Sequence, residues 1–427
     1  MTHLYFDNYR GFSGQFVELA KVNFLVGENS TGKSSVLDLM DVFGNKRFWL
    51  FSPDFIPESG LESSFSDLIS AASKNRKNFT IGAVDVDGNG MSANGMFVTY
   101  ENSNGSTSIS RITVFTGQIC TVVNGDLSSE KIGRLSVKRV INTTPRRKMD
   151  EALNFLIETH HSRNGFRSKT VPENYHGAPI MIIISEYIIR NKIRKNDDGF
   201  GFDIKIPKAF SYDFVNIAPI RAMPRRTFDG SMGEFKSAGE HTPYLIRKML
   251  KVSNFRSYLE DFGRESGLFD SIGARVYGKS PTAPFEIEVE LGEKSLSLNN
   301  VGLGVSQSLP IVVEVFLRRE ETFFAIQQPE VHLHPKAQAS FGGAIHGLAK
   351  KQNKLFAIET HSDFAIDRFR IECRKSGYVG SKIFFFSKKG GFNSISEINI
   401  LEDGCVASDQ PSEYRDFFLN ESIELLG

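Results

Sequence analysis

The segment Gly27–Ser34, which reads GENSTGKS, constrains the fold of this chain more than any other feature. It fits the pattern G-x-x-x-x-G-K-[ST]. The apolar run Val22–Val26 before it predicts a short buried strand, and Ser34–Met40 after it has apolar residues at helical spacing. A strand, a glycine-bearing loop and a helix are the context in which this pattern binds phosphate. The loop N–H groups turn inward and the helix N-terminus adds its positive end.

This context gives the loop residues expected roles. Lys33 is expected to reach the β- and γ-phosphates of ATP, and the Ser34 hydroxyl is expected to bind Mg²⁺. The alternative is a glycine turn before an ordinary helix. The expected nucleotide-binding residues of the loop are Asn29, Ser30, Thr31, Gly32, Lys33, Ser34 and Ser35.

The charge balance limits the possible nucleic-acid surfaces. The 427 residues, enough for two or three domains, include 51 Lys plus Arg and 50 Asp plus Glu, which excludes a uniformly basic surface. Local basic clusters occur at Lys138–Arg139, Arg146–Lys148 and Arg190–Lys195. Such clusters are either solvated faces or surfaces for nucleic acid or an acidic partner.

Cysteine usage and hydropathy favour a cytoplasmic protein. Cys120, Cys373 and Cys405 are widely spaced and form neither a zinc pattern nor a disulfide framework, which fits a reducing compartment. The first residues show no signal-peptide pattern. The longest apolar run, Ala178–Ile184, has only the length of a strand, so we expect no membrane span and no membrane partner.

Outside the loop, hydrophobic periodicity predicts a mixture of strands and helices. Residues 79–123 are expected to form a meander of short strands separated by hairpin-type turns. No internal repeat and no sustained heptad pattern is found, which argues against a long coiled coil. Further expected elements are a strand at His3–Tyr9 with its return at Phe16–Leu19, helices at Asp150–His160 and within Gly239–Glu260, and a half-exposed strand at Phe285–Leu291.

The last third of the chain predicts a βαβ unit. Thr322–Ile326 and Leu355–Glu359 are apolar strands, and a helix is expected between them over Lys336–Lys351. Functional residues gather at the carboxyl ends of such strands. Earlier, Leu298–Gln307 leads into an expected apolar helix at Ser308–Leu317, giving a second glycine-bearing helix N-terminus that can face phosphate.

Together these motifs resemble the ABC-type ATPases of the SMC/RecF/OLD class, and especially stand-alone ATPases of antiphage defence systems of the Septu and PARIS types. The matching elements occur in the same order as in that class, whereas residues 90–210 match nothing specific. They are Asn8–Phe12, the phosphate loop, Ala218–Arg226, Val301–Pro310, Gln327–Pro335 and Thr360–Ser362.

The resemblance implies an α/β fold, namely the ABC-type P-loop ATPase fold with a mixed sheet, an antiparallel β elaboration and a helical insertion. Residues 1–125 would form the N-terminal half of the ATPase domain, with the phosphate loop and the β meander. Residues 126–270 would form a partly helical insertion. Residues 271–427 would form the C-terminal half, with the signature, a Walker B-like strand and the switch histidine.

The resemblance also implies an ATP-sandwiched homodimer or higher oligomer. Arg10 would contact the nucleotide, and His361 would be the switch histidine that senses the γ-phosphate. His332 and His334 are either metal ligands or packing residues of their loop. The signature residues expected to contact the γ-phosphate of another subunit are Gly302, Gly304 and Ser306.

One departure from the class affects catalysis. Where the class places an acid that holds Mg²⁺ and then a catalytic Glu or Gln, this chain has Gln327 and Gln328. A glutamine orients water but supplies neither a negative charge to the metal nor a general base. We therefore expect Gln327, Gln328 and His361 at the catalytic position, Ser34 and Gln327 at the metal position, and slow hydrolysis or a trapped ATP.

The expected function is an ATP-binding and ATP-hydrolysing subunit of a prokaryotic antiphage defence complex. It would control a separate effector such as a nuclease, because about 65 residues after Ser362 are too few for an appended catalytic domain and predict strands that complete the ATPase. The alternatives are a non-hydrolysing ATP-gated scaffold or DNA clamp and a DNA-repair ATPase that binds nucleic acid. A transporter cassette is disfavoured by the mid-chain insertion.

Overall fold

A computed structural model describes residues 1–56, 64–129, 131–144, 146–190, 204–230 and 234–414. The chain divides into two compact units. The first contains residues 1–19, 28–213 and 386–395, and the second contains residues 20–27, 214–385 and 396–427. The chain therefore passes from the second unit to the first between Gly27 and Glu28, within the phosphate loop motif.

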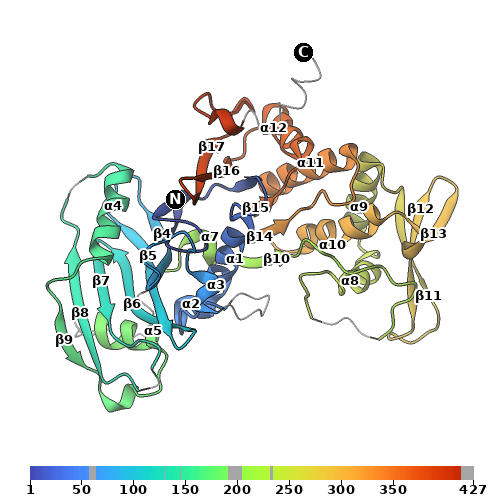
Figure 1. Cartoon of the computed structure of the whole chain (residues 1–427). Helices are drawn as coiled ribbons and strands as arrows, with labels where there is room; N and C mark the ends of the chain where they lie inside the picture. The colour runs from blue at the N-terminus through green and yellow to red at the C-terminus, as the bar shows by residue number, and fades with distance from the viewer. Residues whose placement is uncertain (57–63, 130, 145, 191–203, 231–233, 415–427) are drawn as a thin grey trace. The chain divides into compact units, whose positions relative to one another are not determined.

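The first unit is built on an antiparallel sheet of eight strands, in the order β2-β1-β4-β5-β6-β7-β8-β9 (Figure 1). Helix α4 packs Ala152, Leu153 and Leu156 against apolar side chains of this sheet. The strands are β1 (Thr2–Asp7), β2 (Gln15–Glu18), β4 (Asn78–Val86), β5 (Ala93–Ser103), β6 (Ser106–Gly117), β7 (Ile119–Asn124), β8 (Arg134–Ile141) and β9 (Arg167–Thr170).

Several helices accompany this sheet in the first unit. The helix that follows the phosphate loop, α1, buries Val36, Leu37 and Met40 on one face. The helical segments are α1 (Lys33–Gly44), α2 (Lys46–Leu50), α3 (Phe65–Leu68), α4 (Met149–His160), the 3-10 helix η1 (Glu173–Tyr175), α5 (Ile180–Ile182), the π-helix η2 (Ile183–Arg190) and α7 (Lys208–Ser211).

The second unit is built on a six-stranded sheet in the order β10-β14-β15-β3-β16-β17. Strands β14, β15 and β3 are parallel, whereas β16 and β17 are joined by two residues and so form an antiparallel hairpin. The sheet is therefore mixed. Its strands are β3 (Val22–Gly27), β10 (Asp213–Ile217), β14 (Thr322–Gln327), β15 (Leu355–Glu359), β16 (Ser381–Lys389) and β17 (Phe392–Asn399).

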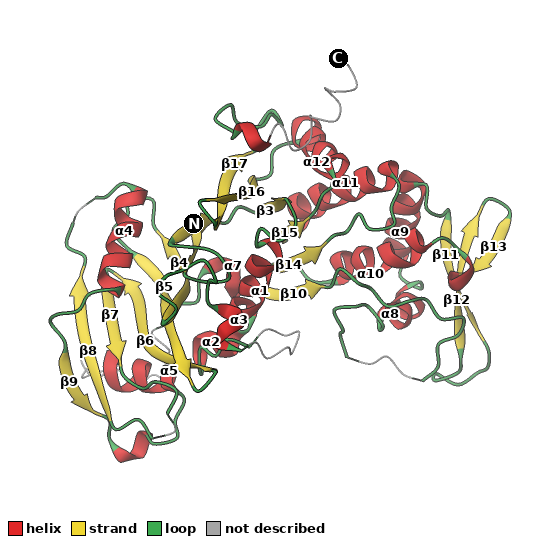
Figure 2. Ribbon diagram, viewed as in Figure 1, coloured by secondary structure: helices red, strands yellow, loops and turns green. Residues whose placement is uncertain are grey.

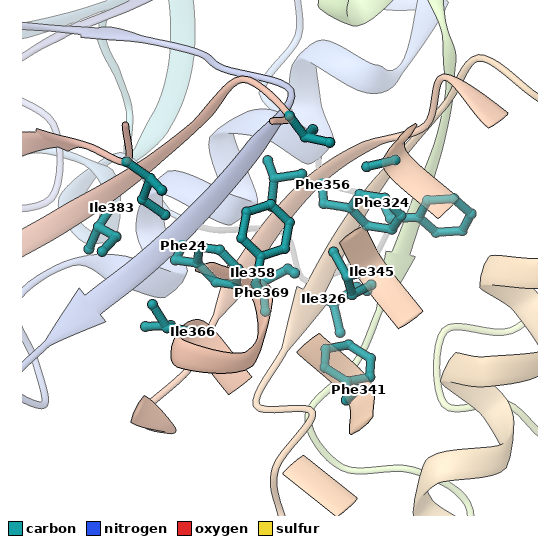
Figure 3. Packing of buried hydrophobic residues seen from close by; sticks show 14 of the residues in the cluster. Phe24, Phe324, Ile326, Phe341, Ile345, Phe356, Ile358, Ile366, Phe369 and Ile383 are labelled. Atoms are coloured by element: carbon teal, nitrogen blue, oxygen red, sulfur yellow. The ribbon is translucent and has the colours of Figure 1, made fainter. Parts of the chain in front are cut away.

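Alternate residues of the parallel strands form the main core of the second unit. Phe24, Ile326 and Ile358 occupy one register row and point to the same face. Side chains of α10 (Leu303–Leu317), α11 (Pro335–Gln352) and α12 (Asp363–Ser376) belong to the same buried apolar cluster. Figure 2 shows the three helices beside this sheet. Figure 3 shows Phe341 and Ile345 of α11 near Ile326, and Phe369 of α12 near Phe24 and Ile358.

A second cluster of apolar side chains joins the remaining elements of this unit. A three-stranded antiparallel sheet, β11 (Ser271–Val276), β12 (Phe285–Leu291) and β13 (Lys294–Ser297), packs Phe285, Ile287 and Val289 toward the helices. These residues alternate with Glu286, Glu288 and Glu290, as the sequence pattern predicts. The helices of this cluster are α8 (Thr242–Met249), α9 (Ser253–Ser266), α10 and α11, with the 3-10 helix η3 (Leu298–Asn300) before α10.

The structure confirms the α/β class, with a mixed sheet and an antiparallel elaboration. The predicted strands at Val22–Val26, Thr322–Ile326 and Leu355–Glu359 are present, as is the helix at Asp150–His160. The three domain ranges 1–125, 126–270 and 271–427 stay a prediction. Among the described residues, no helix is long and apolar enough to cross a bilayer.

The apolar run Ala178–Ile184 lies mostly in helix α5 and the π-helix η2. One local prediction is wrong in its bounds. The apolar helix expected at Ser308–Leu317 begins earlier, at Leu303, and holds Pro310 in its interior.

Candidate nucleotide-binding site

The phosphate loop has the backbone conformation that its glycines predict. Ser30 has φ 62° and Gly32 has φ 97°, both in the left-handed region. The Thr31 hydroxyl and the Lys33 ammonium both donate to the carbonyl oxygen of Glu28, at 2.8 Å and 2.7 Å. The loop therefore curls around one carbonyl group, with Thr31 and Lys33 buried and Asn29, Ser30 and Ser34 exposed.

Helix α1 begins at Lys33 with Gly32 as its N-cap, and no side chain caps it. The exposed Ser34 and half-buried Ser35 thus lie in the first helical turn, where backbone N–H groups point out along the axis. Phe12 packs against this point. A β-carbon at Gly32 would lie 2.5 Å from the Phe12 ring and 2.9 Å from the Asn393 amide nitrogen. Glycine is therefore needed here for both backbone conformation and space.

Arg10 lies beside α1. Its Nη1 donates to Asp38 Oδ2 on that helix at 2.5 Å, and its guanidinium lies 5.6 Å from the centre of the Tyr9 ring. The neighbouring Asn393 donates from its backbone N–H to Gly11 O at 2.8 Å and from its amide to Arg10 O at 3.2 Å. Arg10 is thus joined to the helix that follows the loop, and its role as a nucleotide contact stays a prediction.

Other residues predicted from the sequence lie at the ends of two strands in the second unit. Parallel strands β14, β15 and β3 end at Gln327, Glu359 and Gly27, so their carboxyl ends meet at one edge of the sheet. Strand β15 lies between β14 and β3. Residues Glu28–Ser34 follow β3 directly in the sequence.

The strand end at Gln327 is held by a buried arginine that the sequence analysis did not assign to the site. Arg221, only 2% exposed, donates from Nη2 to the carbonyl oxygens of Gln327 and Gln328, at 2.8 Å and 3.2 Å. Burial lowers the pKa of Arg221 to about 10, and the nearby Glu330 carboxylate opposes this shift. The Gln307 amide of α10 donates to Arg221 O at 3.5 Å. Arg221 therefore lies between the signature helix and the strand end.

Gln328 leaves the strand in an unusual conformation, with φ 44°. Its backbone N–H donates to the carbonyl oxygen of Glu359 at 2.8 Å, which continues the pairing of β14 with β15 by one residue. Both Gln327 and Gln328 are half-buried. The left-handed turn directs the chain away from the sheet directly after the residue expected to orient water.

Glu330, the nearest acid after β14, is held by the loop that follows β15. Its Oε2 accepts a hydrogen bond from the Thr360 hydroxyl at 2.8 Å, and its Oε1 accepts one from the backbone N–H of His361 at 2.7 Å. Both carboxylate oxygens thus bind and position the segment that carries the predicted switch histidine. The side chain of His361 is exposed.

The predicted signature residues are not equivalent. Gly302, the N-cap of α10, is exposed, whereas Gly304 and Ser306 are buried. A β-carbon at Gly304 would lie 2.8 Å from His332 O, and the Ser306 hydroxyl donates to Leu303 O at 3.0 Å. Gly302 is therefore the signature residue most accessible to a phosphate from outside the chain.

Several other predicted features have structural partners. His334 is the N-cap of α11, since its Nδ1 accepts from Ala337 N at 3.4 Å, which favours packing over metal binding. In the part of the chain that the structure describes, no group of three His, Cys, Asp or Glu side chains is arranged for a metal. Arg147 stacks on Phe155 at 4.1 Å. Residues 191–195 of the last basic cluster lie outside the described residues.

These features fit a nucleoside triphosphate at the loop. The N–H groups of the left-handed loop and of the uncapped start of α1, together with the Lys33 ammonium that now donates to a carbonyl oxygen, can donate hydrogen bonds to phosphate oxygens. The exposed Ser34 hydroxyl fits a Mg²⁺ ligand. Gln327 does not supply the negative charge that Mg²⁺ prefers.

Comparisons with known proteins agree with ATP chemistry. Residues 239–366 match the AAA ATPase domain family, which supports an ATP-binding ATPase domain in this part of the chain. No curated protein matches the sequence.

Solved structures of SMC head domains are also similar, at low identity. One is the SmcHead bound to the C-winged helix domain of ScpA, at 15% identity and TM-score 0.41, covering 93% of this chain and 97% of that one. Another is the SMC head domain from Thermotoga maritima, at 12% identity and TM-score 0.39, covering 93% and 98%. A third is the Smc head domain with an extended coiled coil bound to the C-terminal domain of ScpA derived from Pyrococcus furiosus, at 14% identity and TM-score 0.39, covering 100% and 99%.

Proposed function

We propose that this chain is the ATP-binding and ATP-hydrolysing subunit of a prokaryotic antiphage defence complex that works in the cytoplasm. It forms an ATP-dependent oligomer and controls a separate effector such as a nuclease. The conformation of the phosphate loop carries the nucleotide-binding part of this proposal. The ATPase family match supports it, and the order of motifs along the sequence supports the defence role.

Nucleotide binding would use the loop and the first turn of α1. Lys33 exchanges the carbonyl oxygen of Glu28 for phosphate oxygens, and the amides around Gly32 point at the same oxygens. Ser34 would hold Mg²⁺, which would supply positive charge against the phosphates. Gln328 would orient the attacking water, and His361 would contact the γ-phosphate.

The exposed start of α10 supports the ATP-dependent oligomer. Gly302 and Leu303 are exposed, and the N-cap of the helix carries no side-chain cap. This end of α10 can therefore approach the γ-phosphate held by another copy of the chain. Gly304 and Ser306 would act by positioning that end, because they are buried.

A non-hydrolysing ATP-gated scaffold or DNA clamp is a second candidate. The paired glutamines favour it, and Glu330 binds Thr360 and His361 through both carboxylate oxygens, so it is not available as a general base without breaking these contacts.

Titration calorimetry and phosphate release separate these functions. The unaltered chain is expected to bind ATP, and Lys33→Ala is expected to weaken this binding by about 100-fold, since the ammonium is lost while the loop backbone is kept. Absence of ATP binding by the unaltered chain would reject both functions. ATP binding without phosphate release would reject the ATP-hydrolysing function and support the non-hydrolysing scaffold.

The oligomer has its own test. ATP is expected to convert the monomer to a dimer or larger species in light scattering, and Gly302→Arg is expected to prevent this while keeping ATP affinity. A salt-dependent complex with DNA that requires Arg146 would favour the clamp.

A further inference from the structure

The face of the first unit's sheet on which α4 packs changes from apolar to polar at the end of that helix. Three strands each contribute an apolar residue to the cluster with α4, namely Val84, Phe97 and Phe115. Residues two or four positions away on the same strands share this face. The row of directly paired residues at those positions is polar, and it consists of Thr80, Thr99, Arg111 and Asn124.

A β-bulge brings one more polar residue to this row. Thr99 pairs with Arg111, but Tyr100 pairs with Ile109, so Ser110 is an extra residue in β6. Neighbouring residues of a regular strand point to opposite faces, whereas Ser110 and Arg111 line the same cavity. Bulges often occur next to functional sites, where they re-aim a side chain.

This cavity has a volume of about 510 Å³ and lies within the first unit. Besides the row and Ser110, its lining includes Glu101 and, from the segment after α4, His161 and Arg163. Every described residue that lines it is polar or charged. The volume is that of a small-molecule site, and the lining suits a polar ligand rather than an apolar one.

Two arginines give the cavity positive charge. The half-buried Arg111 donates from Nε to Asn124 Oδ1 at 2.7 Å and from Nη1 to His160 O at 2.6 Å. Burial lowers the pKa of Arg111; Glu101 opposes this shift, and the nearby positive charge of Arg163 adds to it. The two like charges therefore repel each other, and an anion bound to both would relieve the repulsion.

A buried histidine holds the hydroxyl groups of the row. The Thr80 and Thr99 hydroxyls share a hydrogen bond at 2.9 Å, and the Thr99 hydroxyl also bonds to His160 Nε2 at 2.8 Å. The other ring nitrogen, Nδ1, bonds to the Thr113 hydroxyl at 2.7 Å. Burial lowers the pKa of His160 well below its ordinary value, so the ring is uncharged at neutral pH. The hydroxyls are thus fixed before a ligand arrives, which reduces the entropy cost of binding.

We propose that this cavity binds a small polar molecule through a phosphate or carboxylate group held by Arg111 and Arg163. A guanidinium suits both groups, because it donates two parallel hydrogen bonds to either of them. The hydroxyl and amide groups of the row bind the remainder of the molecule. None of the described residues of the phosphate loop lines the cavity, so this ligand is additional to the nucleotide.

The test measures the binding of orthophosphate and of malonate to the full chain by calorimetry. A non-hydrolysable ATP analogue with Mg²⁺ is present at saturation, and Lys33→Ala is titrated as well, so that anion binding at the phosphate loop is separated. Arg163→Gln is expected to weaken anion binding at least about 10-fold, since it removes a charge-assisted hydrogen bond. This variant should fold, because Arg163 is exposed and forms no hydrogen bond or ion pair within the described residues.

Arg167→Gln is the matched control, because it removes the same charge from an exposed residue that does not line the cavity. Its affinity for both anions should stay within about 2-fold of the unaltered protein, since exposed charges are screened. Glu101→Gln should have the opposite effect and strengthen anion binding about 2- to 5-fold, because Glu101 is the carboxylate among the described lining residues.

A readout from the cavity itself is the nuclear magnetic resonance signal of the His161 ring, identified with His161→Gln. It should shift when either anion binds to the unaltered protein. A response to orthophosphate alone would support a phosphorylated ligand, and a response to malonate would support a carboxylate. Neither heat nor shift with both anions, or an equal loss of affinity in Arg163→Gln and Arg167→Gln, would overturn the proposal.

Discussion

The carboxylate of Glu330 accepts a hydrogen bond from the hydroxyl of Thr360 at 2.8 Å, and so joins the loop after β14 to the loop after β15. The same hydroxyl accepts from the backbone N–H of Ser362 at 3.0 Å, and Thr360 is fully buried. The buried Thr360 hydroxyl thus donates to the Glu330 carboxylate and accepts from the Ser362 N–H, and it fixes the segment that carries His361.

Thr360→Val is expected to destabilise the protein by about 1 to 3 kcal/mol, since it leaves an oxygen of the half-buried Glu330 carboxylate and the backbone N–H of Ser362 without their partner. Phosphate release should fall as well, because His361 loses its support. Thermal unfolding and turnover check this, with Thr360→Ser as the control that keeps the hydroxyl. Equal behaviour of the two variants would show that the hydroxyl is not needed.

Gln328→Glu is expected to raise phosphate release at least about 10-fold, because a carboxylate at this position can act as a general base, whereas the amide only orients water. The left-handed conformation of residue 328 should be kept, since Glu and Gln have the same shape. Single-turnover kinetics check the prediction, and Gln328→Ala serves as the control that should not accelerate the step. No acceleration by Gln328→Glu would place the limiting step elsewhere.

Gly32→Ala is expected to cost on the order of 2 kcal/mol and to weaken ATP binding. The new methyl group meets the Phe12 ring, and φ 97° is unfavourable for alanine. Adding Phe12→Leu should recover part of the lost stability, since it makes room but leaves the backbone strain. Full recovery in this pair, measured by thermal unfolding, would mean that the strain is negligible.

Lys354 predicts a pH dependence in the second unit. Its fully buried ammonium donates to Val315 O at 2.6 Å, and desolvation lowers its pKa from 10.5 to about 8. The folded state therefore loses this proton before the unfolded state does, so the cost of burying the charge is constant below pH 8 and is relieved as the pH rises from 8 toward 10.5.

Over this range, the unaltered protein is expected to gain up to about 3 kcal/mol of stability relative to Lys354→Met, at about 1.4 kcal/mol for each pH unit. Unfolding midpoints of the two proteins at pH 7.5, 9 and 10, chosen as roughly spanning this window, check the difference. A difference that stays constant with pH would mean that the pKa of Lys354 is not lowered.

The sequence predicted the parts of the site that are local in the chain. The strand at Val22–Val26, the loop and the helix after it follow from neighbouring residues, since the turn needs glycine and the flanking periodicities are clear. The βαβ unit at Thr322–Glu359 could also be predicted, because its two apolar strands and the helix between them have clear periodicities. The predicted helix bounds differ from those of α11 by one residue at each end.

Residues brought together from distant parts of the chain could not be predicted in the same way. Arg221 belongs to a segment that the sequence singles out, but its contact with Gln327 joins residues 106 positions apart. Glu359 pairs in register with Gln327 because β14 and β15 are neighbouring parallel strands, which spacing along the sequence does not show. The early start of α10 was missed because Gly302 and Gly304 indicate a loop, and packing of Gly304 against His332 outweighs that preference.

Asn393 contacts the backbone of Arg10 and Gly11, and its amide lies close to Gly32. A residue that supports the phosphate loop is therefore synthesised long after the loop itself. Asn393 follows Arg10, its hydrogen-bond partner, by 383 positions in the sequence. The nascent chain is therefore expected to acquire nucleotide affinity late in translation, after the hairpin of β16 and β17 has emerged.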